Sequence, residues 1–290
     1  MFGLFKKTPE KPNSSVVKQA LRTQQDHLVE AVLISGVVLP PYPVILEKID
    51  RLLSRDDYSL SELARLIEGD AGLTSALMRI ANSPVFGVSK TVANIEQAFS
   101  ILGISRIQTI LRSELLRNAL KDYGSPALLT QLWNRYSKIA ELATTLVSHS
   151  NLLKGKTDLV YMIGMFHGAG SFILLKRHPL VTSSHIKPNG DFELQMTQLN
   201  EALNTNHAMI GGMVAKSWRL PIVVSDAIAK QRDHTNFDGL TGILIQFLQA
   251  TILLHDNKLM NEESKPLLSY LTERLGIEQS VIEALAKCSK

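Results

Sequence analysis

The pattern of apolar residues is the feature that most restricts the fold of this chain. Sustained alternation of apolar and polar residues is missing, and the Asn189-Gly190 pair lies in a polar segment instead of between two β-branched runs. Apolar residues recur every three to four positions over almost the whole chain, which is the period of an amphipathic helix. The sequence therefore predicts an all-α protein.

Two helix starts can be placed from local chemistry. Ser59 and Glu62 form a capping box, because the Ser59 hydroxyl can accept an early amide while Glu62 reaches back to the cap amide. Ser125 precedes Pro126, which suits a first helical turn because its missing N–H is harmless there. We expect helices at about 14–34, 43–54, 59–67, 73–82, 94–102, 105–121, 126–149, 158–178, 191–204, 207–218, 221–231, 240–255 and 263–286.

A turn-rich segment at residues 121–126 separates shorter helices from longer, more apolar ones. We interpret it as a joint between two lobes of one unit, since no long linker or repeat is visible. The expected organisation is an N-terminal tip and helix at 1–36, a two-lobed domain at 37–235, and C-terminal helices at 236–290 packed on the second lobe. The lobes are expected at about 37–121 and 126–235.

Composition and charge narrow the functional classes. A net charge of +4 over 290 residues makes no phosphate-binding field by itself, so nucleic acid is not implied. The lone cysteine, Cys288, can close no internal disulfide, and the first residues have the wrong charge order for a signal peptide. The apolar stretches 159–175 and 240–254 are shorter than a membrane span and are expected to be buried core helices. We therefore expect a cytoplasmic protein without stable membrane insertion.

Candidate catalytic chemistry is limited. The sequence has no Gly-x-Ser-x-Gly elbow and no phosphate-binding loop, which leaves metal chemistry and the histidines His167 and His207 beside small residues. A hydrolytic metal site usually needs three or more protein ligands, including a carboxylate, and Gly168 supplies none. Two hydrogen-bonded core histidines are the favoured interpretation, and a divalent-metal centre is the alternative.

Several motifs in a fixed order resemble the HDOD family, the output-domain branch of the HD metal-dependent phosphohydrolase superfamily. The motifs are LPPYP at 39–43, IEGDAGL at 67–73, RIANSPVFG at 79–87, IEQAFSILG at 95–103, HAMIG at 207–211 and WRLP at 218–221. The resemblance implies a helical domain of bacterial signal-transduction proteins, often linked with cyclic-dinucleotide signalling and mostly without demonstrated activity.

The resemblance also identifies the positions of the HD metal ligands. Tyr136 stands where metal-binding relatives have a histidine in the long middle helix. His167-Gly168 stands in place of the signature His-Asp pair, and Gln231-Arg232 in place of two adjacent histidines. Of the expected ligands only His167 and His207 remain, so the resemblance implies a degenerate metal site.

His234 is a candidate for a third histidine ligand at that site. It lies beyond the expected ligand positions, and a shift of three residues moves a side chain about 4.5 Å along a helix on roughly the same face. Three imidazoles without a bridging carboxylate would suit zinc better than magnesium or manganese. A phosphohydrolase or cyclic-dinucleotide phosphodiesterase using His167, His207 and His234 is therefore the alternative function.

A further possibility is anion binding without metal. The helix expected at 105–121 has the pattern of a basic face. Its cations are Arg106, Arg112, Arg117 and Lys121. A phosphate-bearing messenger would need arginines that converge in a cleft, and one sequence does not show convergence. Nucleotide binding stays open.

Two proline-containing segments are relevant to partner binding. Residues 39–43 contain three prolines and must form an extended strap, which we expect to pin the N-terminal helix through Leu39 and Tyr42. The loop at 82–87 carries Phe86, and an exposed aromatic side chain is a typical protein-binding anchor. We therefore expect the lobe at 37–121 to carry the partner surface, with Phe86 contributing.

The function favoured by the sequence is a non-enzymatic bacterial signalling module that acts by protein–protein interaction. Its expected partners are signalling proteins such as a response regulator or a cyclic-dinucleotide enzyme, and no cofactor is expected. The oligomeric state stays open.

Overall fold

The computed structural model describes residues 37–83, 91–187, 190–233 and 239–288. Every regular element in these ranges is helical, so the predicted all-α class is confirmed. Residues 1–38 and 39–290 form two units, and the fold described here is that of the second. The expected helix at 14–34, Phe86 and His234 lie outside the described residues. The predicted domain and lobe boundaries stay predictions.

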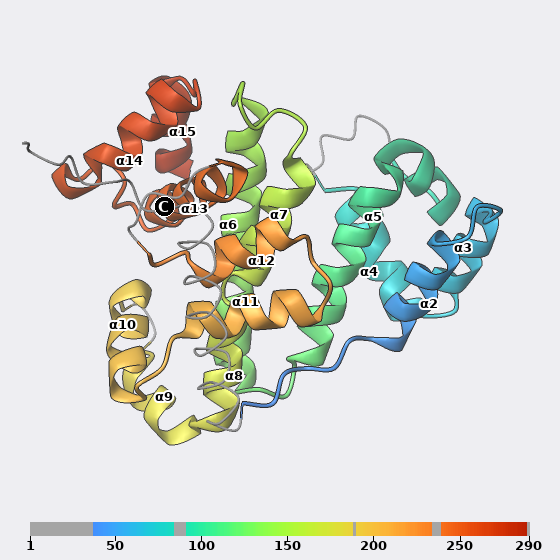
Figure 1. Ribbon diagram of the computed structural model, residues 1–290, viewed down its shortest axis with the longest axis horizontal. Coiled ribbons are helices and arrows are strands. Elements are labelled where there is room, and N and C mark those ends of the chain that lie inside the picture. Colours follow the sequence, from blue (N-terminus) through green and yellow to red (C-terminus); the bar gives the residue numbers. More distant parts are fainter. Residues whose placement is uncertain (1–36, 84–90, 188–189, 234–238, 289–290) are drawn as a thin grey trace, which may run out of the picture. The chain divides into compact units, whose positions relative to one another are not determined.

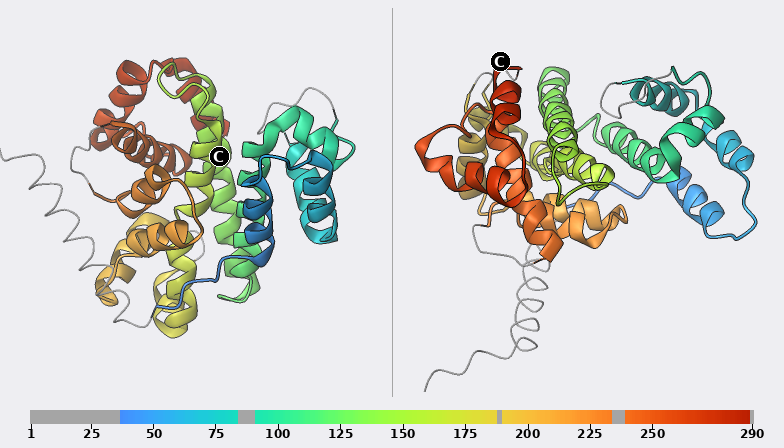
Figure 2. Two further views of the ribbon diagram at one scale, coloured as in Figure 1. Left: turned by 45° about the vertical axis from the view of Figure 1, so that its right-hand side comes forward. Right: turned by 90° about the horizontal axis from the view of Figure 1, so that it is seen from above.

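The first helices of this unit are short and pack on a longer one. The structure has α2 at Val44–Leu53, α3 at Leu60–Glu68, α4 at Ala71–Ala81 and α5 at Ile95–Ala119. Gly103 has non-helical backbone angles, with φ 78°, and divides α5 into the two helices that the sequence predicts. Figures 1 and 2 both show α2, α3 and α4 on the same side of α5.

The remaining helices form the larger part of the unit, and α6 packs against α7, α13 and α15. They are α6 at Pro126–Ser148, α7 at Thr157–Phe166, α8 at Ala169–Arg177, α9 at Pro179–His185, α10 at Phe192–Ala202, α11 at His207–Ser217, α12 at Ile222–Ala229, α13 at Gly239–His255, α14 at Lys265–Ser269 and α15 at Gln279–Cys288. A 3₁₀ turn at Glu262–Ser264 and a π-helical turn at Tyr270–Arg274 flank α14. Figure 1 shows α6, α7, α11 and α12 as neighbours.

Both predicted helix starts are confirmed. The Ser59 hydroxyl accepts from the Glu62 amide, and the Glu62 carboxylate accepts from the Ser59 amide. Ser125 caps α6, with Pro126 in the first turn. Because both motifs act within a few residues, local chemistry determined where these helices begin.

The structure differs from the expected helices in three places. The segment expected as one helix at 158–178 bends at His167 and Gly168, and its two halves are α7 and α8. The short helix α9 was not expected, although Pro179 stands in its first turn. The helix expected at 263–286 is interrupted at Gly276, which adopts φ 67° and so leaves the helical region.

The apolar segments 159–175 and 240–254 are buried, as the sequence predicts. By length and composition, Thr157–Arg177 could cross a membrane, but 89% of its most apolar window is buried inside the fold. This stretch contains α7 and α8, which supply much of the core around the candidate site.

The proline strap at residues 39–43 is extended, as predicted, and its contacts within this unit are specific. The Trp218 indole donates to the Pro40 carbonyl at 3.0 Å, and the rings of Tyr42 and Trp218 meet edge to face. Tyr42 donates its hydroxyl to Asp50 at 2.6 Å. Asp50 also accepts from Arg112 and Arg219, so this carboxylate ties the strap to α2, α5 and the end of α11.

Candidate functional site

His167 lies at the bend between α7 and α8, where its imidazole is buried. Its Nδ1 lies 2.7 Å from the Gly164 carbonyl, which can only accept, so Nδ1 carries the proton and Nε2 keeps a lone pair. That Nε2 atom has no hydrogen-bond partner among the described residues. Burial lowers the pKa of His167 to about 3, against the smaller opposing effect of the bond to Gly164. The imidazole is therefore neutral at pH 7.

Tyr136, on α6, fills the space beside His167. The two rings meet edge to face with centroids 4.8 Å apart, and the tyrosine is fully buried. The Ser171 hydroxyl donates to the Gly168 carbonyl at 2.7 Å, so Tyr136 must donate to Ser171, also at 2.7 Å. Burial raises the pKa of Tyr136, outweighing the opposing effects of Ser171 and Arg135. The phenol is thus a neutral, hydrogen-bonded part of the core.

Gly168 has no room for a side chain. A Cβ atom there would lie 1.9 Å from Cζ of Tyr136, far inside van der Waals contact. An aspartate at this position and the observed Tyr136 ring therefore exclude each other. Glycine at position 168 and tyrosine at position 136 therefore depend on each other through packing.

His207 begins α11 and is also buried. Asn200 accepts the His207 backbone N–H through Oδ1 at 3.0 Å, which places its amide nitrogen 2.9 Å from His207 Nδ1. Burial, with smaller contributions from Arg232 and His167, lowers the pKa of His207 to about 3. This histidine is neutral and has a fixed partner on α10.

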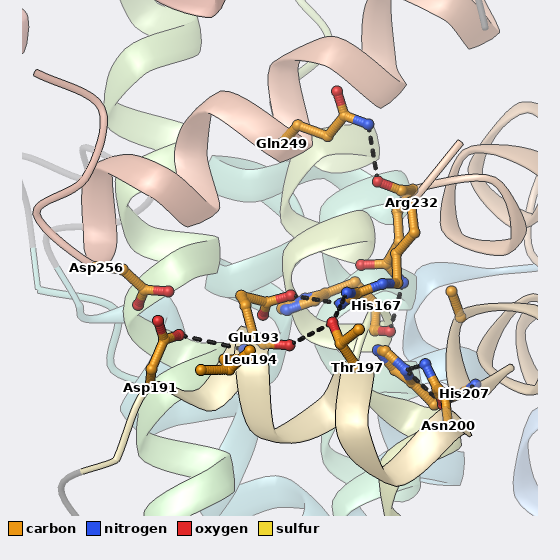
Figure 3. A network of polar contacts seen from close by, with 12 residues as sticks. His167, Asp191, Glu193, Leu194, Thr197, Asn200, His207, Arg232, Gln249 and Asp256 are labelled. Carbon is orange, nitrogen blue, oxygen red and sulfur yellow. Dashed lines mark hydrogen bonds and ion pairs between the residues drawn. The ribbon is translucent and has the colours of Figure 1, made fainter. Parts of the chain in front are cut away.

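The positions that replace the adjacent histidines have structural partners. The Gln231 amide donates to the His167 carbonyl at 2.9 Å and to the Ile228 carbonyl at 3.1 Å. It thereby satisfies a carbonyl at the bend between α7 and α8. Arg232 donates to Glu193 at 2.9 Å and to Thr197, both on α10 (Figure 3).

A second arginine, Arg135, extends this polar network. It makes a two-pronged ion pair with Asp256, one N–O distance being 3.0 Å, and donates to Glu193 at 3.1 Å. Burial raises the pKa of Asp256, but hydrogen bonds from His255 and Arg135 outweigh it and hold the pKa at about 2. Burial lowers the pKa of Arg135, and Asp256 and Glu193 reverse that shift. Both groups are therefore charged at pH 7.

The residues around His167 do not fit the metal that the resemblance implies. Tyr136 occupies the space a carboxylate at Gly168 would need, and Gln231 and Arg232 are engaged elsewhere. In the described ranges, no group of three His, Cys, Asp or Glu side chains could hold a metal ion. The structure brings Tyr136, Gly168 and Gln231 into contact with His167 or its backbone, and His207 and Arg232 both contact α10. His234 lies outside the described residues.

The basic face expected on α5 does not converge on a ligand. Arg112 pairs with Asp50 at 3.2 Å, and Arg106 pairs with Asp158 at 3.4 Å. Arg117 and Lys121 instead line a shallow pocket between α4 and α5. The four cations are therefore divided among different neighbours.

Sequence reasoning missed Arg135, Glu193, Asn200 and Asp256. Glu193 is 58 residues from Arg135, and Asp256 is 121 residues from it. No local spacing reveals pairs so far apart. Arg135 stands between Asn134 and Lys138 on α6, so its charge alone gave no local sign that it is buried.

The sequence matches the model of one protein family over most of its length. The model of the HDOD domain matches residues 39–234. An uncharacterized protein of Treponema pallidum (strain Nichols) is 25% identical over 220 residues, covering 74% of this chain and 41% of that relative. The chain thus matches less than half the length of this curated relative.

Solved structures share the fold. An HDOD domain protein with unknown function from Geobacter sulfurreducens has a TM-score of 0.68 and 20% identity, with 93% of this chain and 95% of that chain covered. A protein from Shewanella amazonensis SB2B, provisionally named a metal-dependent phosphohydrolase, has a TM-score of 0.67 and 16% identity, with 93% and 99% covered. A provisionally named signal-transduction protein from Marinobacter aquaeolei VT8 has a TM-score of 0.60 and 21% identity, with 89% and 58% covered. At these identities the likeness shows the fold alone.

Proposed function

Since the chain belongs to the HDOD domain family, we propose that it is a non-enzymatic signalling module that acts by binding other proteins, without a working metal site. The family is related to HD phosphohydrolases and to signal-transduction proteins. We place this module in the bacterial cytoplasm, in a two-component or cyclic-dinucleotide pathway, with no cofactor. Its partners on this proposal are signalling proteins such as a response regulator.

One observation carries the proposal. The Tyr136 ring occupies the position that any side chain at Gly168 would need, since a Cβ atom there would lie 1.9 Å from the tyrosine Cζ. A metal site of the HD type needs a carboxylate ligand in addition to histidines for hard divalent ions. In this chain the buried ring of Tyr136 occupies the volume that such a carboxylate at position 168 would need.

The alternative is a metal-dependent phosphohydrolase that uses His167, His207 and His234. The Nε2 atom of His167, which has no hydrogen-bond partner in the part of the chain that the structure describes, favours it, because a buried lone pair can act as a metal ligand. The neutral state of both described histidines would also permit coordination. The decisive quantity is the amount of bound metal.

Metal content and phosphodiesterase activity separate the two functions. Protein purified without chelator should contain far less than one equivalent of zinc, manganese or iron by elemental mass spectrometry. It should also hydrolyse cyclic dinucleotides no faster than the His167→Ala variant does. Stoichiometric metal, together with phosphodiesterase activity that His167→Ala abolishes, would establish the alternative.

The partner surface is proposed on residues 37–121, with Phe86 contributing. Cross-linking followed by mass spectrometry should recover fewer partner peptides from Phe86→Ala than from the wild type. Ile222→Ala is a matched control, because Ile222 is a highly exposed apolar residue on α12. Unchanged partners from a Phe86→Ala protein with wild-type circular dichroism would remove Phe86 from the interface.

A further inference from the structure

One carboxylate, that of Glu193, lies between two guanidinium groups. Its Oε1 accepts from Arg135 at 3.1 Å, and its Oε2 accepts from Arg232 at 2.9 Å. The arginines come from α6 and from the residues after α12, so tertiary folding alone makes them converge. Figure 3 shows Arg232 directed at Glu193 beside Thr197 and His167. An anion bridged by two arginines is the arrangement that a bound phosphate would take.

The two arginines and two carboxylates of this cluster, beside which His255 contacts Arg135 and Asp256, balance in charge only while Glu193 is present. Arg135 and Arg232 contribute two positive charges, and Glu193 and Asp256 contribute two negative charges. His167 and His207 add none at pH 7, because both are buried and neutral. Withdrawal of Glu193 would therefore leave one uncompensated positive charge, with Arg232 lacking its carboxylate partner.

The members of this cluster differ in their exposure to solvent. The Arg135 side chain is 11% exposed, whereas those of Arg232 and Glu193 are 29% and 28% exposed. The guanidinium of Arg135 thus forms the inner end of the cluster, and Arg232 and Glu193 form its accessible end. Partial burial strengthens the attraction between an anion and these groups, because the local dielectric is lower than in water.

Glu193 belongs to a helix that is held by both polar and apolar contacts, among them the packing of Phe192 on Arg135 and Tyr136. It stands in the first turn of α10, where Asp191 caps the helix and pairs with Lys258. Farther along α10, Thr197 contacts Arg232 and Asn200 contacts His207, while Met196 and Leu199 are buried. Since Met196 and Leu199 anchor α10 independently of Glu193, a rotation of the Glu193 side chain alone would release the two guanidinium groups.

We propose that Arg135 and Arg232 form a binding site for the terminal phosphate of a small phosphorylated molecule, and that Glu193 occupies this site when the ligand is absent. The paired guanidiniums supply the positive charge that metal ions supply in hydrolytic sites, but they neither activate water nor provide a nucleophile. The ligand is consequently bound and not hydrolysed. This site goes beyond the proposed protein-binding function.

Binding of inorganic phosphate to the full chain, measured by isothermal titration calorimetry at constant ionic strength, tests the proposal. Glu193→Gln removes the competing charge and keeps the side-chain volume, so its affinity for phosphate should exceed that of the wild type by about tenfold or more. Glu201→Gln is the matched control, because Glu201 lies on the exposed side of the same helix. It should bind phosphate as the wild type does.

The double variant Glu193→Gln with Arg232→Gln should lose the gained affinity. If Glu193→Gln fails to fold by circular dichroism, Glu193→Ala replaces it, since it also removes the competing charge, and it too should bind phosphate more tightly than the wild type. A folded Glu193 variant with wild-type affinity, or a gain that persists without Arg232, would overturn the proposal. Such a failure would leave the metal and partner experiments unaffected, so the two proposals are separable.

Discussion

The two sides of His167 are built in opposite ways. On the inner side, Gly168 lies against the Tyr136 ring, and a Cβ at Gly170 would lie 1.9 Å from the His207 carbonyl oxygen. On the outer side, charged side chains from α6, α10 and the residues after α13 meet through ion pairs and remain partly accessible.

This difference has a physical consequence. Close contact between backbone and ring atoms leaves no alternative arrangement, because a packed interior has no spare volume. Ion pairs near solvent can exchange one partner for another, since their net free energy is small. The inner side of His167 is therefore fixed by packing, whereas the ion pairs on its outer side are free to change partners.

The largest effect is expected on the inner side. Gly170→Ala should destabilise the protein by about 3 kcal/mol or more, because the added methyl group meets backbone that cannot move away. Gly168→Ala should be comparably costly, but its clash is with the Tyr136 side chain. In a Tyr136→Ala background the cost of Gly168→Ala should fall by at least about 1 kcal/mol, while that of Gly170→Ala should not change. Urea unfolding measures these differences, and equal costs in both backgrounds would contradict the assigned contacts.

The second largest effect on stability is expected at His167 and His207. His167→Ala or His207→Ala should each lower the free energy of unfolding by about 1–3 kcal/mol through a lost buried hydrogen bond and a cavity. Thermal unfolding with and without a chelator provides the check. The wild-type melting temperature should be the same in both conditions, because metal bound to the folded state would add to stability. A sharp drop on adding chelator would show that these histidines hold a metal.

The same histidines predict a pH dependence. Their pKa values are about 3 in the folded protein and near 6.5 when unfolded, so only the unfolded chain takes up protons between these values. Their contribution to stability is complete above pH 6.5 and is lost as the pH falls towards 3, by up to about 1.4 kcal/mol per pH unit for each histidine. Urea unfolding between pH 7 and 5 should show this slope, reduced by about half in His167→Gln. An unchanged slope in that variant would mean that His167 is not buried in the neutral form.

The smallest effect is expected at the exposed end of α10. Asp191→Asn should change stability by about 0.5 kcal/mol or less, because the pair with Lys258 is partly exposed and asparagine retains the helix cap. Chemical denaturation at low and high salt gives the comparison. A loss above about 1.5 kcal/mol would show that this end of α10 is as rigidly held as the inner side.

Much of the fold was predictable because its signals are local. The caps at Ser59 and Ser125, the break at Gly103 and the buried apolar segments all depend on neighbouring residues. The bend at His167 was not predictable, because its carbonyl is satisfied by Gln231, 64 residues away. Gly164, Gly168 and Gly170 interrupt the apolar run there, but glycine is tolerated inside a helix, so these residues alone did not mark the bend.

The sequence by itself determined the helical class and several helix starts, and its resemblance to the HDOD family predicts an incomplete set of metal ligands at Tyr136, Gly168, Gln231 and Arg232. Only the tertiary structure decided that Tyr136 and Gly168 exclude a larger residue at position 168, and that Arg135 and Arg232 meet at Glu193. The reason is the range of the interactions. Capping and periodicity act within a few residues along the chain, whereas contact between α6, α8 and α10 depends on how distant helices pack.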